Sequence, residues 1–206
     1  PEAKDIYRGT LRYPGWCETI CHLNSMKFFE EDVRDVVGLT FGQFTAMQAG
    51  ATKYNDPKKA VCSFLGCKTW ATVILRMEWL GFFDNRPLPF EKGSPRDVIS
   101  TLFLERLYFR PGERDLVILR EEIVASYPDG ARKCHTSTLI DHGIPESWTS
   151  IARTTGTPPA IAAKFILEGK ILTPGVHIPV LPEIYDPILK ELKNEDIVIK
   201  EEIVSL

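Results

Sequence analysis

The sequence predicts an α+β protein, with a mixed or antiparallel sheet and packed helices interrupted by an all-helical insertion. Three observations support this prediction. Apolar residues recur at helical spacing between residues 18 and 109. Two extended runs rich in β-branched residues follow, joined by a Pro-Asp-Gly turn. The last fifty residues alternate between helical and extended patterns, so we expect helices to pack on the sheet.

The first expected element is a strand at residues 6–16, which ends in the turn Pro14-Gly15. We expect this strand to share a sheet with the hairpin predicted further along the chain. Residues 1–17 and 110–206 would then form one α+β domain. Residues 18–109 would be a helical insertion in that domain.

Within residues 18–109, apolar side chains recur three or four positions apart. One clear helix covers residues 70–81, where the final glycine is a typical helix stop. Another is expected to begin after Ser94, which can cap it, with Pro95 at the first helical position and Asp97 near the positive end of the helix dipole. The inward face of this helix is expected to consist of Ile99, Leu102, Phe103, Arg106 and Leu107.

A β-hairpin is expected next, with strands at residues 116–125 and 132–140 and a turn at residues 127–130. The Asp-Gly pair in this turn is a strong hairpin signal. The second strand would place on one face the residues Cys134, Thr136, Thr138 and Ile140.

The C-terminal fifty residues predict two helices and a strand. The first helix is expected to open at Thr157-Pro158 and to end at Gly169. The second is expected to open at Pro182, and a terminal strand to cover residues 197–199. The buried face of the second helix is expected to carry Ile184, Ile188 and Leu192.

The composition is that of a globular protein, 44% hydrophobic and 26% charged. The formal net charge of −3 offers no basic excess to neutralise a phosphate backbone, so nucleic acid is not an expected partner. No apolar stretch approaches the roughly 18 residues that span a bilayer, and no membrane partner is expected. The chain opens without Met and without a secretory leader, so we expect a cytoplasmic protein represented by a fragment.

The five cysteines are an odd number, which favours reduced thiols over a disulfide framework. Cys17-x3-Cys21-His22 and Cys62-x4-Cys67 could together supply four zinc ligands. Neither pair has the two-residue spacing of a zinc knuckle, and the first lies in an expected helix. Small buried thiols explain these cysteines more simply, so no metal site is predicted.

The most informative local pattern is Arg8-Gly9-Thr10-Leu11-Arg12-Tyr13. In a strand, Arg8, Thr10 and Arg12 would lie on the same side. A guanidinium group matches a carboxylate through two hydrogen bonds, a glycine allows a ligand close to the backbone, and a hydroxyl can donate. This pattern predicts a site for an anionic, amino-acid-like ligand. On spacing alone, solvent-exposed or ion-paired arginines are the alternative.

The sequence contains no phosphate-binding glycine motif of the recognised kinds. No Gly-x-Gly-x-x-Gly follows a predicted strand, and no Gly-x-x-x-x-Gly-Lys occurs. No nucleotide site is therefore predicted within the chain.

Residues 8–13 resemble a signature of glutamate-forming saccharopine dehydrogenases, a family that includes the dehydrogenase half of aminoadipic semialdehyde synthase. Other stretches resemble the same family in the same order. These are residues 78–83, 113–119, 136–143, 154–164, 167–171 and 182–187. Several colinear motifs are more specific than any one, so the chain is similar to the C-terminal, substrate-binding and dimerisation portion of these enzymes.

The resemblance implies a larger enzyme than this chain. A Rossmann domain absent from this chain would bind most of the NADP, with NAD as the alternative cofactor. Residues 156–206 would pack on that nucleotide domain and leave an exposed apolar patch without it. The resemblance also implies a homodimer, and a chain that is inactive without its nucleotide domain.

The implied reaction interconverts saccharopine with glutamate and aminoadipic semialdehyde. Saccharopine carries three carboxylates, which are natural partners for two arginines. By resemblance Thr10, Leu11 and Arg12 would contact it through hydroxyl, backbone and guanidinium groups, with Arg8 and Gly9 next in order. No catalytic acid or base is assigned within the chain.

Departures from the family pattern leave the exact substrate open. They occur at residues 14–16, at His142 and at Thr157, and residues 41–59 match only weakly. One alternative is a related imine-reducing enzyme of polyamine synthesis, of the carboxynorspermidine type. The other is a dimerisation or binding module without catalysis.

Overall fold

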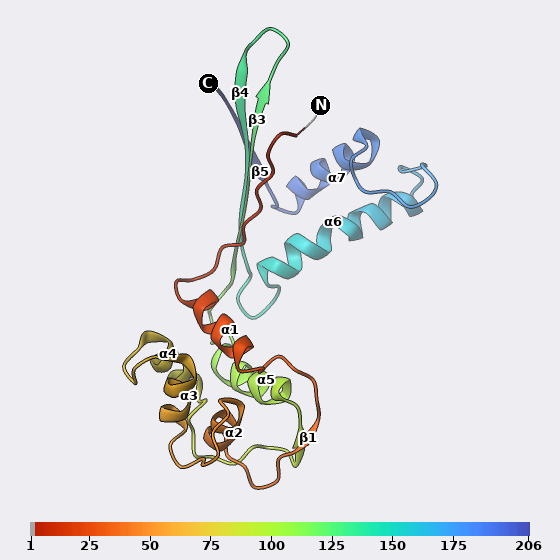
Figure 1. Cartoon of the computed structure of the whole chain (residues 1–206). Coiled ribbons are helices and arrows are strands. Elements are labelled where there is room, and N and C mark those ends of the chain that lie inside the picture. The colour runs from red at the N-terminus through yellow and green to blue at the C-terminus, as the bar shows by residue number, and fades with distance from the viewer. Residues whose placement is uncertain (1–2) are drawn as a thin grey trace. The chain divides into compact units, whose positions relative to one another are not determined.

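The computed structural model describes residues 3–206 and divides at residue 108 into two compact units, Pro1–Tyr108 and Phe109–Leu206. Helices dominate the first unit, and a sheet with two helices forms the second (Figure 1). This arrangement confirms the α+β fold class. The assignment of residues 1–17 to the same domain as residues 110–206 stays a prediction.

The regular structure of the first unit is helical, as the periodicity of residues 18–109 predicts, apart from a two-residue antiparallel ladder. The ladder joins β1 (Arg34–Asp35) to β2 (Lys92–Gly93). The helices are α1 (Trp16–Ser25), α2 (Phe41–Gln48), α3 (Pro57–Leu65), α4 (Thr72–Leu80) and α5 (Pro95–Arg106).

The helix ends follow the predicted capping signals. Gly81 ends α4 in the left-handed conformation, with φ +96°. Ser94 caps α5 in a capping box, because its hydroxyl accepts from Asp97 N–H while the Asp97 carboxylate accepts from Ser94 N–H. The predicted inward face of α5 is correct at Ile99 and Leu102, which are buried. It is wrong at Arg106 and Leu107, which are exposed because the helix ends there.

The core of the first unit is built around aromatic side chains. Phe28 contacts Phe82 edge to face, with ring centroids 5.0 Å apart, and Phe44 at 6.1 Å. The largest buried side chains around them are Leu23, Met26, Phe41, Ile74, Met77 and Leu102.

The predicted N-terminal strand is wrong. Residues 5–13 have no regular secondary structure, and Leu11 and Tyr13 are 78% and 89% exposed. A strand is stable only when its backbone groups pair with a neighbour. Within the described chain, residues 3–12 form no backbone hydrogen bond to another strand, and the three-stranded sheet takes its third strand from the C-terminus.

The second unit is built on the predicted hairpin. β3 (Leu116–Ser126) pairs antiparallel with β4 (Arg132–His142), from Leu116 opposite His142 to Ser126 opposite Arg132. Gly130 takes φ +85° in the turn, as the Asp-Gly signal requires. β5 (Ile199–Ser205) adds to the other side of β4, giving the order β3-β4-β5. The terminal strand therefore starts two residues later than predicted.

Helices α6 (Ser150–Leu167) and α7 (Pro182–Asn194) pack together beside the sheet (Figure 1). The predicted opening of α6 at Thr157-Pro158 is wrong, because both residues lie inside the helix. The predicted opening of α7 at Pro182 is confirmed. The core between helices and sheet consists of Leu139, Ile161, Phe165, Ile184, Ile188, Leu192 and Ile197.

Several apolar side chains at and after the C-terminal end of α6 are exposed. The exposed side chains are Ile166, Leu167, Leu172, Val176, Ile178 and Val180. These residues lie in the part of the chain, after residue 156, where the family resemblance implies an exposed apolar patch. Among the described residues, no helix is both long and apolar enough to cross a bilayer.

Candidate functional site

The predicted ligand-binding residues lie together in the exposed N-terminal segment. Arg8, Gly9, Thr10, Leu11 and Arg12 all face solvent. Arg8 and Arg12 do not share a strand face as predicted, because residues 8–12 are not part of a strand. Arg12 donates to the Leu11 carbonyl at 2.7 Å. Within residues 3–206 neither arginine forms an ion pair, so each guanidinium group is open to a carboxylate ligand.

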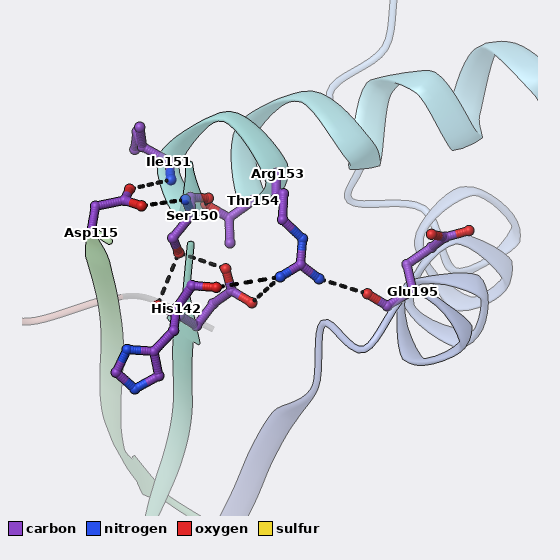
Figure 2. A network of polar contacts seen from close by, with 8 residues as sticks. Asp115, His142, Ser150, Ile151, Arg153, Thr154 and Glu195 are labelled. Carbon is purple, nitrogen blue, oxygen red and sulfur yellow. Dashed lines mark hydrogen bonds and ion pairs between the residues drawn. The ribbon is translucent and has the colours of Figure 1, made fainter. Parts of the chain in front are cut away.

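A second polar cluster, which sequence reasoning missed, joins β4 to α6 (Figure 2). Asp141 is 6% exposed and Ser150 is fully buried. The Ser150 hydroxyl lies 2.5 Å from Asp141 Oδ2 and 2.9 Å from its carbonyl oxygen. Arg153 Nη1 donates to Asp141 Oδ1 at 3.1 Å, and Arg153 Nη2 donates to the Glu195 carbonyl at 2.9 Å. The buried carboxylate is therefore both hydrogen-bonded and paired with a cation, as a buried charge requires.

Asp115, just before β3, holds the first turn of α6. Its two carboxylate oxygens accept from the backbone N–H groups of Ser150 and Ile151, at 2.6 and 2.9 Å (Figure 2). A negative charge here also interacts favourably with the helix dipole. Gly143 is needed beside it, because a Cβ on Gly143 would lie 2.1 Å from Asp115 Oδ1.

This cluster explains why α6 begins eight residues before Pro158. Thr149 caps the helix by accepting from Ala152 N–H at 3.1 Å, and Asp115 satisfies two further N–H groups. Together these contacts offset the hydrogen bonds that prolines remove from a helix interior. The charged groups of this cluster hold α6 against the sheet, and we assign the cluster a structural role.

Two surface hollows lie away from residues 8–12. The hollow of about 630 Å³ in the first unit is lined by residues that include Lys53, Asn55 and Lys59. The hollow of about 410 Å³ in the second unit is lined by residues that include Arg110 and Arg114. Neither hollow is lined by residues 8–12.

The cysteines are the other residues that the sequence raises as possible functional groups, either as reduced thiols or as zinc ligands. All five cysteines are free in this structure. Within residues 3–206, no three His, Cys, Asp or Glu side chains are grouped so as to hold a metal ion.

Residues 1–198 match the family model described as "Saccharopine dehydrogenase C-terminal domain". The chain belongs to this family. The match confirms the family that the colinear motifs indicate, and its C-terminal portion in particular.

The relatives agree with this assignment. Saccharopine dehydrogenase [NADP(+), L-glutamate-forming] of Saccharomyces cerevisiae is 33% identical over the whole chain, which covers 48% of that relative. The mitochondrial alpha-aminoadipic semialdehyde synthase of Bos taurus is 31% identical over 96% of the chain and 22% of its own length. The chain therefore spans about half or less of these relatives.

A solved structure shows the same fold. It is that of apo histidine-tagged saccharopine dehydrogenase (L-Glu forming) from Saccharomyces cerevisiae, which matches 94% of this chain and 45% of its own with a TM-score of 0.75 and 32% identity. The likeness extends over both units, because so much of the chain is covered.

Proposed function

We propose that this chain is the substrate-binding C-terminal part of an oxidoreductase that interconverts saccharopine with glutamate and aminoadipic semialdehyde, using NADP. The observation that carries the proposal is the match over the full chain to relatives of that name. The two unpaired arginines supply the chemistry, because the substrate class is rich in carboxylates and a guanidinium binds a carboxylate through paired hydrogen bonds.

In this proposal, residues 8–12 bind the substrate. Arg8 and Arg12 bind carboxylates, Thr10 donates through its hydroxyl, and the backbone at Gly9 and Leu11 allows close approach. NADP, when bound, would accept hydride from the carbon next to the bridging nitrogen of saccharopine, and water would then cleave that carbon–nitrogen bond. The role of this chain is to hold the substrate anion in register for that transfer.

The NADP itself would bind mainly to a nucleotide domain outside the chain. The absence of a glycine-rich phosphate-binding motif from the sequence supports this division. We propose that the exposed apolar side chains after residue 166 pack on that domain, and that the enzyme is a homodimer. A cytoplasmic location stays a prediction, because three relatives carry a mitochondrial name.

The test uses the full-length protein, with NADPH formation measured in the presence of saccharopine and NADP. We expect Arg12→Ala to raise the Michaelis constant about ten- to 150-fold, which corresponds to the roughly 1.5–3 kcal/mol of a hydrogen bond to a charged group. Arg106→Ala is the matched control, because Arg106 is an exposed arginine at the end of α5. An unchanged Michaelis constant in Arg12→Ala would remove Arg12 from the site.

The same assay separates the alternatives. Turnover of a carboxylated polyamine without turnover of saccharopine would assign the chain to an imine-reducing enzyme of polyamine synthesis. Turnover of neither substrate by the full-length protein would favour a dimerisation or binding module.

A further inference from the structure

The C-terminal end of α3 brings two thiols together. Gly66 ends the helix in the left-handed conformation, with φ +65° and ψ +26°, and Cys67 N–H donates back to the Cys62 carbonyl at 3.0 Å. This bond, between residues five apart, is that of a Schellman motif. In such a motif the residue after the glycine packs its side chain against the residue that accepts this bond. Here both positions are cysteines.

The distance between the two residues suits a disulfide. The 3.0 Å bond from Cys67 N to Cys62 O, with the covalent bonds on either side, limits the separation of their Cα atoms to about 7 Å. Disulfides join Cα atoms that lie roughly 4.4–6.8 Å apart. Cys67 also packs against the core cluster that contains Cys62. The backbone therefore needs little movement for a bond between the sulfurs.

The environments of the two thiols differ. Cys62 is 7% exposed and belongs to the core of the first unit, whereas Cys67 is half-buried and packs against that core. Burial, followed by the neighbouring Cys67, raises the pKa of the Cys62 thiol. Cys62 is thus shielded from reagents in solution, and Cys67 is the thiol of the pair that they meet first.

We propose that Cys62 and Cys67 form an oxidation site, at which a hydroperoxide converts the two thiols to an intramolecular disulfide across the end of α3. The proposal rests on the Schellman geometry, which holds the two cysteine backbones close together, and it is independent of the proposed dehydrogenase function.

The reaction proceeds in two steps. The Cys67 sulfur attacks one peroxide oxygen, the O–O bond breaks, and a sulfenic acid and one water form when hydrogen peroxide is the oxidant. The Cys62 sulfur then attacks the Cys67 sulfur, the S–O bond breaks, and the proton of Cys62 leaves with the oxygen as a second water. The two thiols together lose two electrons, which reduce the peroxide.

The sequence makes this site easy to test by mass spectrometry. Trypsin cleaves after Lys59 and Lys68, so one peptide, residues 60–68, contains both cysteines. The reduced full-length protein is treated with hydrogen peroxide, unfolded, alkylated with iodoacetamide and digested. We expect this peptide to lack two hydrogen atoms and to carry no alkyl group, and dithiothreitol to restore both alkylation sites.

Three controls define the role of the fold. Cys67→Ser should leave Cys62 reduced and fully alkylated after the same treatment, because the buried thiol has lost its reactive neighbour. Cys134→Ser should leave the disulfide unchanged. In urea the wild-type peptide should form the disulfide more slowly than in the folded protein, because the motif no longer holds the thiols together.

The outcomes decide the proposal even if Cys67→Ser fails to fold. Two alkyl groups on the wild-type peptide after peroxide treatment would overturn it, as would a sulfinic or sulfonic acid on Cys67 in place of the disulfide. A rate in urea equal to the rate in the folded protein would show that the motif does not create the site.

Discussion

The ion pair between Asp141 and Arg153 should contribute measurably to stability, unlike a pair on the surface. The two side chains are 6% and 19% exposed, so solvent screens their attraction weakly. A hydrogen bond to a charged group at 3.1 Å is worth about 1.5–3 kcal/mol. We therefore expect Asp141→Asn to lower the free energy of unfolding by about 2 kcal/mol. Arg153→Met should cost about 1 kcal/mol more, because the bond to the Glu195 carbonyl is lost as well.

A double-mutant cycle isolates the pair from these other contacts. The double variant should be more stable than the sum of the single losses predicts, with a coupling of about 1–3 kcal/mol. Urea unfolding followed by far-UV circular dichroism measures each free energy. The control is the pair Lys164–Glu191, which joins α6 to α7 at 3.4 Å with side chains 53% and 28% exposed. Its coupling should be below about 0.5 kcal/mol. Equal couplings in the two cycles would refute the argument from burial.

Three further perturbations test other parts of the fold by urea unfolding. Gly81→Ala should lower the free energy of unfolding by about 2–3 kcal/mol, because its φ is +96° and a Cβ would lie 3.1 Å from Leu102. Gly50→Ala is the control and should cost only about 1 kcal/mol, because Gly50 has φ +74° but open space around it. Equal losses in the two variants would contradict the role of the contact with Leu102. Hydrogen bonds from the Ser94 backbone and hydroxyl lower the pKa of Asp97 from 3.8. The stability that Asp97 contributes is therefore fully present above that value and is lost as the pH falls through the lower pKa of the folded protein. Asp97→Asn should weaken this loss of stability in acid, and an unchanged dependence of the unfolding free energy on pH would refute the assignment. Ile188→Ala should lower the stability of the second unit by about 2–5 kcal/mol, and a loss below 1 kcal/mol would mean that α7 does not depend on this core.

Helix caps and the hairpin could be predicted because their interactions are local. The Ser94 capping box acts over three residues, and Gly81 ends α4 through its own backbone conformation. The hairpin required only a turn that accepts a positive φ at Gly130 and two runs of extended residues. In each case the residues that decide the structure are neighbours in the sequence.

The errors occurred where a distant residue decides the outcome. Residues 6–16 have the composition of a strand, but a strand forms only against a partner, and in the described chain the three-stranded sheet consists of β3, β4 and β5. Pro158 is a local signal for a helix start, yet α6 begins at Ser150 because Asp115, thirty-five positions away, accepts from its N–H.

The family and the α+β class could be predicted from the sequence and are confirmed, whereas residues 8–12 as the substrate site stay a prediction. These depend on residue identity and order, which colinear motifs record directly. The interior ion pair of Asp141 and Arg153, and the bond from Cys67 N–H to the Cys62 carbonyl at the end of α3, are visible only in the folded chain. Burial and contact depend on how the chain folds back on itself, and spacing along the sequence does not specify them.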